Sequence, residues 1–348
     1  MDRPLAEEGI SEVVGFVFIL ALVVGGLSLY LVYGVPVLGR EAEISQMDDV
    51  RGWFVDYKTG VDQLWLNSPA VPNNSTPYVP GDFAPLLDRM AFYSISTGQV
   101  TLRHVINAGA IQERGFVLRY LPMLAPVPAS AEVSVRSDEN FTVSGWRNGV
   151  EVLRWNKSAP ALVYSSHNNY WLQQEYYYQL GGVFLRQWDP NGKVPETVMV
   201  VQSPPFSVFP PDVGDTGYQT MAGLVVANLN VTKGGFGSRS PIRVETRLAA
   251  DPLPLESSDI KQPYEFSNVS LTFEGKNDQS ALAWSTVFNG SAERNGINSS
   301  YYNVSLSGPV ARIDILGYET NPNIADVQFG ALEASYIMKL ENVPTIIE

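Results

Sequence analysis

Residues that could carry out catalysis are few and far apart in this sequence. There is no cysteine, and the only histidines are His104 and His167. They form no H-x-x-H or H-E-x-x-H spacing, so the sequence offers little support for a metal site. Without cysteine there is also no thiolate nucleophile and no disulfide. We therefore predict that the chain is not an enzyme and has no catalytic, cofactor-binding or metal-binding residues.

Two short motifs resemble functional ones, but turns explain them better. Asp215-Thr216-Gly217 spells the triplet of aspartic proteases, whose chemistry needs two facing carboxylates that share a proton. The triplet occurs once and follows prolines, so we expect a turn there. Residues 189–193 (Asp-Pro-Asn-Gly-Lys) also predict a turn and have too few carboxylates for calcium.

Aromatic residues gather between positions 164 and 178, where they could stack on sugars. Tyr170, Tyr176 and Tyr178 alternate along the chain and so share one face of a strand. This alternation favours packing in a core over ligand binding.

Nine N-x-[S/T] sequons are candidate sites of N-glycosylation, and all follow the apolar stretch described below. They are Asn73, Asn74, Asn140, Asn156, Asn230, Asn268, Asn289, Asn298 and Asn303. Asn73 and Asn74 overlap, so we expect only one of that pair to be modified. This density is typical of a glycosylated surface protein.

The composition predicts a large soluble body. The chain has 348 residues, 45% hydrophobic and 17% charged, and a net charge of −13. This length can bury a substantial core without disulfides. The negative charge argues against nucleic acid as a partner.

One uncharged stretch dominates the N-terminal region. Residues 13–33 contain no charged side chain, which is enough for a helix to cross a bilayer core. A cleaved secretory signal fits poorly, because the stretch is long and Arg3 is the only basic residue before it. Two interpretations of this stretch remain: an uncleaved membrane anchor, or an apolar helix that stays on the mature chain after a short leader before it is cut off.

The junction at Gly9 carries a resemblance to a known family. Gly9 is followed by Ile10-Ser11-Glu12-Val13-Val14-Gly15, which resembles the class III signal peptide of archaeal type IV pilin-like proteins. The resemblance implies that a prepilin peptidase cuts between Gly9 and Ile10 and leaves the helix on the mature chain. Glu8 departs from the Lys or Arg that the family usually has there. Two stretches of the body are also similar to uncharacterised pilin-like surface proteins, mostly of methanogens: residues 164–206, which include the hairpin at 176–187, and residues 271–306.

Several residues near this junction could serve assembly. Glu12 could pair with the new α-amino group at Ile10 of the same or a neighbouring subunit, or it could lie at headgroup level in water. Gly15, Gly25 and Gly26 would let helices approach closely.

A helical stalk follows the apolar stretch. Pro36 predicts a kink, because proline lacks the N–H and clashes with the preceding turn. Apolar residues then recur every three or four positions and predict an amphipathic helix. They are Ile44, Met47, Val50, Phe54, Tyr57, Val61 and Leu64.

Beyond a Pro-rich linker the hydrophobic period changes to two, which predicts strands. Alternating segments are residues 100–105, 114–121, 131–136, 141–146, 264–273 and 310–316. The best hairpin is residues 176–187, with Gly181-Gly182 as its turn and Leu180 opposite Val183. One helix is expected after Asn277 or Asp278, with Ala281, Trp284, Val287 and Phe288 on one side before Gly290.

The sequence thus predicts an α+β protein: a long N-terminal hydrophobic and amphipathic helix, then a mainly antiparallel, sandwich-like β head with one short helix. We expect a leader (1–9), a transmembrane or pilin-core helix (10–39), a stalk (40–68), a linker (69–85) and an extracellular head (86–348), as one unit or two that divide near 210–220.

We expect a pilin-like cell-surface protein, a subunit or minor component of an archaeal type IV pilus-like filament. Its expected partners are the membrane, crossed once with the head outside, a prepilin peptidase, and other pilin-like subunits through the N-terminal helix. The first alternative is a monomeric membrane-anchored glycoprotein, as an adhesin or attached to the S-layer. An exported hydrolase is a third interpretation, for which the sequence shows no catalytic constellation.

Overall fold

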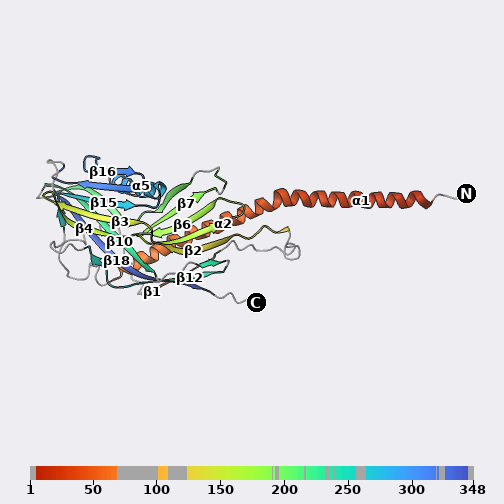
Figure 1. The fold of residues 1–348 in the computed structure, drawn as a ribbon, viewed down its shortest axis with the longest axis horizontal. Coiled ribbons are helices and arrows are strands. Elements are labelled where there is room, and N and C mark those ends of the chain that lie inside the picture. Colours follow the sequence, from red (N-terminus) through yellow and green to blue (C-terminus); the bar gives the residue numbers. More distant parts are fainter. Residues whose placement is uncertain are drawn as a thin grey trace.

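The computed structural model describes residues 5–68, 101–108, 124–189, 191–192, 196–214, 217–231, 236–238, 240–255, 264–318, 320 and 326–343. Within these residues the chain forms one long helix followed by a head of three sheets and a shorter helix. Figure 1 shows the first part of the long helix projecting away from the head, while the second part runs into it. The predicted α+β fold class is confirmed, and the linker predicted at 69–85 lies outside the described residues.

The long helix has three consecutive parts: α1 (Leu5–Leu29), a π-helical turn (Tyr30–Gly34) and α2 (Val35–Leu66). Pro36 lies in the first turn of α2. Proline cannot donate to the carbonyl four residues earlier and crowds it, and the wider π turn before Pro36 accommodates this without ending the helix. The predicted irregularity at Pro36 is therefore a π turn within a continuous helix.

Helix α2 carries the predicted apolar stripe into the head. Of the seven predicted residues, Ile44 is half-buried and the other six are buried. Trp65 and Leu66 extend the buried side. The helix contacts strands of two sheets, so its stripe forms part of the head's own core.

Sheet A is organised around its longest strand, β18 (Val327–Asn342). The order is β1 (Thr101–Ile106), β12 (Ile242–Leu248), β18, β10 (Gly217–Val231) and β9 (Phe206–Gly214). β13 (Leu253–Pro254) and β14 (Tyr264–Phe266) also pair with β18. β10 and β18 are parallel, whereas the other pairs of described strands are antiparallel.

Sheet B has the order β11 (Phe236–Ser238), β2 (Ser130–Arg136), β5 (Ala161–His167), β6 (Gln173–Gln179), β7 (Gly182–Trp188) and β8 (Thr197–Gln202). The predicted hairpin is present as β6–β7, but the predicted register between its two strands was wrong. The turn is Leu180-Gly181, both with positive φ (49° and 85°), and Tyr178 pairs with Val183. Both faces of this hairpin are buried, so hydrophobicity alone could not fix the turn.

Sheet C has the order β16 (Tyr302–Ser307), β17 (Val310–Leu316), β15 (Asn268–Glu274), β3 (Asn140–Arg147) and β4 (Val150–Ser158). The helix numbered α5 (Asp278–Arg294) covers part of its inner face. The Asn277 side chain caps α5 by accepting the Ser280 backbone N–H at 2.9 Å, as predicted. The helix continues past Gly290 to Arg294, so the predicted end was too early.

Two hydrophobic cores fill the head. The first lies around α2, sheet A and sheet B, and the second lies around α5 and sheet C. Strand β10 contributes Val225 to the first core and Val226 to the second, because side chains alternate along a strand. Near residues 210–220, β9 and β10 pair with each other, and each core draws described residues from both sides of this point.

Candidate functional site: the apolar helix and its collar

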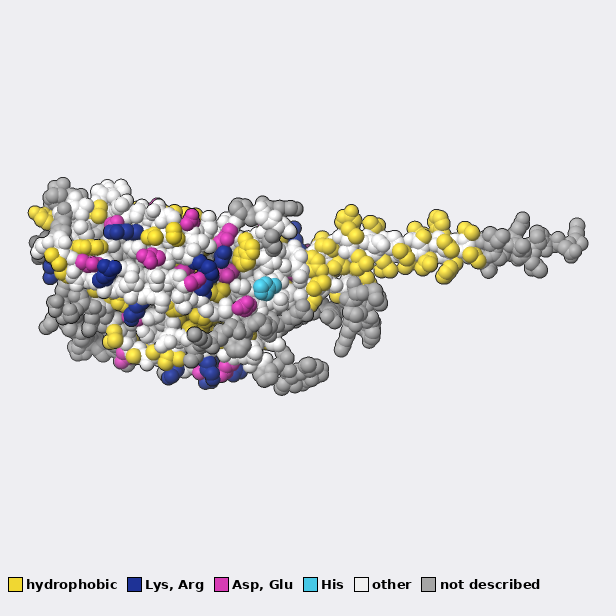
Figure 2. All heavy atoms as spheres, viewed as in Figure 1, with side chains coloured by type: hydrophobic (Ala, Val, Ile, Leu, Met, Phe, Trp, Pro, Cys, Tyr) yellow, Lys and Arg dark blue, Asp and Glu magenta, His cyan; other side chains and the backbone are white. Residues whose placement is uncertain are grey.

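The projecting helix exposes apolar side chains on all sides. We call residues 13–33 the apolar rod. Phe16 is 67% exposed and Leu22 is 65% exposed, although neither has a polar group. Figure 2 shows hydrophobic side chains along the visible face of the rod, in contrast to the mixed surface of the head. The helix Val13–Leu66 is long and apolar enough to cross a membrane.

The serine hydroxyl within the rod is hydrogen-bonded to its own helix. Ser28 donates from its Oγ to the backbone carbonyl of Val24 at 2.8 Å. A serine bonded back to its own helix presents little unsatisfied polarity to hydrocarbon. The rod is therefore suited to an apolar environment, either lipid or other helices.

The predicted assembly residues lie on this helix. Gly9, Ile10 and Glu12 are part of α1, and their side chains lie outside the described part of the structure. Apart from the adjoining residues of the helix itself, no described atom lies within 4 Å of the position that a Cβ would occupy at Gly15, Gly25 or Gly26. Their backbone is thus open to approach by another helix.

Where the rod meets the head, two loops of the head pack against the helix. We call residues 124–129 and 168–172 the collar. The carboxylate of Glu43 accepts the backbone N–H groups of Asn169 at 2.6 Å and Tyr170 at 2.8 Å. Glu43 is only 2% exposed, so these are buried, charge-assisted hydrogen bonds.

Aromatic side chains complete the collar. The Arg40 guanidinium lies 4.2 Å from the centre of the Trp171 ring, a cation–π contact. The Tyr170 ring packs on Gly39, where any Cβ would collide with it. The Tyr170 hydroxyl accepts the Val127 N–H at 3.0 Å, which joins the two loops. On the helix, the Tyr30 hydroxyl donates to the Leu124 carbonyl at 3.4 Å.

The collar was not predicted from the sequence. Tyr176 and Tyr178 do lie in the core as expected, but Tyr170 lies in the collar. A signal was present: Glu43 precedes Met47 by one helical turn and so continues the apolar stripe. A carboxylate in a buried stripe needs donors from another part of the chain.

Deeper in the head, α2 is also held by polar contacts. Lys58 donates to Asp62 at 2.5 Å, a nearly buried ion pair one turn apart. Burial raises the pKa of Asp62, and Lys58 opposes that shift. Tyr57 hydrogen-bonds Thr246 at 2.8 Å, and Tyr336 of β18 donates to the Val61 carbonyl at 3.1 Å. The Thr246 and Tyr336 contacts fix α2 against sheet A, whereas the Lys58–Asp62 pair lies within the helix.

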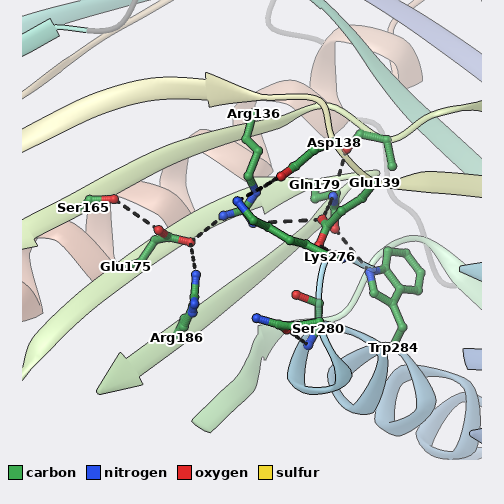
Figure 3. Close-up of polar contacts among 12 residues, drawn as sticks. Arg136, Asp138, Glu139, Ser165, Glu175, Gln179, Arg186, Lys276, Ser280 and Trp284 are labelled. Atoms are coloured by element: carbon green, nitrogen blue, oxygen red, sulfur yellow. Dashed lines mark hydrogen bonds and ion pairs between the residues drawn. The ribbon is translucent and has the colours of Figure 1, made fainter. Parts of the chain in front are cut away.

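A charged network joins sheet B to α5 and the start of sheet C (Figure 3). Arg136 contacts Glu175 at 2.9 Å and Asp138 at 3.3 Å. In a second arm, Gln179 donates to Glu139 at 2.6 Å and accepts from Trp284 of α5 at 3.3 Å. Each of these carboxylates has a cation or donor of the protein, so the network suits a structural link between layers.

The two histidines are not brought together into a site. His104 is in β1 beside the rings of Trp53 and Tyr57, and burial lowers its pKa. His167 is exposed at the end of β5. Among the described residues there is no group of three His, Asp or Glu that could hold a metal. Asp215 and Thr216 lie outside the described residues, between β9 and β10.

The sequons divide by location. Asn140, Asn156, Asn268 and Asn303 all lie on the outer face of sheet C, because an adjacent residue of each (Phe141, Trp155, Val269 and Val304) packs in or against the second core. Asn140, Asn156 and Asn303 are exposed. Asn268 is half-buried and accepts from the Gly317 N–H at 3.1 Å and the Thr320 hydroxyl at 2.9 Å.

The other sequons lie elsewhere. Asn230 is exposed in β10, Asn298 is exposed before β16, and Asn289 is half-buried on α5. Asn73 and Asn74 lie outside the described residues.

Comparisons with known proteins add no name to this arrangement: no family model, curated protein or solved structure matches the chain. The conclusion that the structure supports is therefore coarse: a β-rich head that carries a single apolar N-terminal helix able to span a membrane.

Proposed function

We propose that this chain is a pilin-like cell-surface protein, a subunit or minor component of a type IV pilus-like filament. The observation that carries the proposal is the uncovered apolar rod, which continues without a break into a helix buried in the head. A rod with apolar residues on every side can be buried in a bundle of identical rods or in lipid. The collar holds the head at a fixed position on it.

In this function the chain acts by assembly, without covalent chemistry at the head. A prepilin peptidase would release the segment before Ile10 and leave the rod at the new N-terminus. Glu12 would then lie near the α-amino group of Ile10, within the chain or across a subunit contact. Gly15, Gly25 and Gly26 would allow close helix packing.

The experiment is to determine the native N-terminus by mass spectrometry and to shear cells. The proposal expects a chain that begins at Ile10, and filaments that contain it in the sheared fraction. A Glu12→Gln variant should lower the filament yield, whereas Glu41→Gln, exposed on α2, should not. An intact leader together with protein that stays in the membrane fraction would reject the filament.

The second candidate is a surface glycoprotein that keeps its rod in the membrane, as an adhesin or attached to the S-layer. The internally bonded Ser28 and the open surface of the rod suit lipid equally well. Detergent extraction distinguishes the two candidates: the anchored form should be extracted as a monomer from unsheared cells.

A further inference from the structure

A polar cleft opens where the three sheets meet. Along one face of β10, Leu224 and Val226 pack in the second core, but the next residues on that face are Asn228 and Asn230. On the neighbouring strand β18, Phe329 and Ala331 are in the same core and are followed by Glu333 and Ser335. Val226 pairs with Glu333 and Asn228 pairs with Ser335, so the two strands change from apolar to polar within one step along this face and form the floor of the cleft.

Glu333 organises the donors around this floor. Its carboxylate accepts from Lys157 of β4 at 2.7 Å, from the Asn228 amide at 2.8 Å and from the Trp155 indole N–H at 3.2 Å. These bonds hold three side chains from two sheets in one arrangement. Preorganised polar groups of this kind lose little entropy when a ligand binds.

The cleft is large enough for a small ligand, with a volume of about 560 Å³. This lies within the range of roughly 300–1,000 Å³ typical of ligand sites. Hydroxyl groups dominate its walls, from Ser134, Ser137, Ser158 and Ser335. Val135, Leu229 and Val231 also border the cleft, but their side chains belong to the opposite faces of β2 and β10 and pack in or against the first core.

We propose that this cleft binds a neutral saccharide. Lys157 and Glu333 neutralise each other through their ion pair, so the lining offers no net charge to select an anion or a cation. Serine hydroxyls and amide groups match the hydroxyls of a sugar, both as donors and as acceptors. This binding function goes beyond filament assembly.

Two sources of saccharide fit the same chemistry. Asn230 lines the cleft and belongs to a sequon, so a glycan attached to it could occupy the cleft of its own chain. An external polysaccharide could reach it as well, since the cleft is open to solvent.

The test uses the full chain in detergent, produced in a host without N-glycosylation. Maltotriose, mannotriose and tri-N-acetylchitotriose serve as probes, and a glucuronate trimer serves as the charged comparison. We expect saturation-transfer NMR to detect binding of at least one neutral probe. Ser137→Trp, which fills the cleft, should weaken that binding at least tenfold, and Asn228→Ala should weaken it too. Ser305→Trp, exposed on sheet C, should leave it unchanged.

The proposal is overturned if no neutral probe binds, if the charged trimer binds as well as they do, or if Ser137→Trp binds like the unmodified chain. A second arm uses protein from a glycosylating host. If the chain's own glycan occupies the cleft, added saccharide should bind only after Asn230→Gln. If an external polysaccharide is the ligand, both proteins should bind it. The filament assay is independent of this outcome.

Discussion

The carboxylate of Glu43 accepts the backbone N–H of Tyr170, a residue 127 positions later in the chain, at 2.8 Å. The same Tyr170 packs its ring on Gly39, one turn before Glu43. A side chain of the helix therefore orders a head loop, and an aromatic ring of that loop covers the helix. This reciprocal contact sets the position of the head relative to the rod.

Replacing Glu43 should loosen the collar. Glu43→Gln removes the charge and turns one acceptor oxygen into a donor that faces a backbone N–H. We expect a loss of about 1–3 kcal/mol in the free energy of unfolding, as for buried hydrogen bonds to a charged group. Chemical denaturation of the full chain in detergent measures it. Glu41→Gln, an exposed control, should change stability by less than about 0.5 kcal/mol. Equal stability of the two variants would contradict the role of Glu43.

Two glycines of the same helix should respond in opposite ways to alanine. Gly39→Ala places a methyl group against the Tyr170 ring and should destabilise the chain by about 1–3 kcal/mol. Gly52→Ala meets no atom within 4 Å and should stabilise it by about 0.5–1 kcal/mol through helix propensity. Thermal unfolding of both variants under identical conditions provides the comparison. A stabilising Gly39→Ala would show that the collar does not pack as described.

The sequons of sheet C should differ in use. Asn140, Asn156 and Asn303 are exposed, so a glycan on each would disturb no described contact. A glycan on Asn268 would disturb its hydrogen bonds with Gly317 and Thr320. Glycopeptide mass spectrometry of protein from a glycosylating host should therefore find glycan on one or more of the three exposed sites and none on Asn268. The opposite pattern would refute this assignment.

Glu333 should contribute a pH-dependent part of the stability. Burial opposes its ionisation, but hydrogen bonds from Lys157 and Asn228 outweigh that effect and lower its pKa. Because the pKa is lower in the folded state, this stabilisation is present above the unfolded value of about 4.3 and is lost as the pH falls through the folded value. The unfolding free energies of the unmodified chain and of Glu333→Gln should therefore converge as the pH falls from about 6 to about 3. The exposed control Glu274→Gln should not reproduce this convergence.

The two helices and several strands, among them β1, β2, β3, β15 and β17, could be predicted because their periodicity is strong, whereas the longest strands, β10 and β18, were not predicted. The stripe on α2 and the capping by Asn277 depend on residues close together in the sequence. The β6–β7 register could not be predicted, because both faces are buried and Gly181-Gly182 was as good a turn signal as Leu180-Gly181.

The candidate sites were harder to predict than the elements. In a half-buried strand, Asn and the Ser or Thr two positions later point outward while the residue between them points inward. Asn268-Val269-Ser270 follows this pattern, so the alternation of polar and apolar residues in a strand can produce a sequon whether or not the site is glycosylated. The collar and the cleft join residues more than 100 positions apart, such as Glu43 with Asn169 and Lys157 with Glu333, and no local pattern reports such contacts.

Strand β18 imposes an order on the biogenesis of the protein. It follows every other described strand in the sequence, yet it lies inside sheet A and pairs with β10, β12, β13 and β14. During synthesis the apolar helix emerges first, whereas sheet A cannot close until residue 342 has left the ribosome. The apolar helix, which is able to span a membrane, is thus made before the head can fold. Such long-range pairing is slow to form, so the head stays unfolded for a period after its first strands have been made.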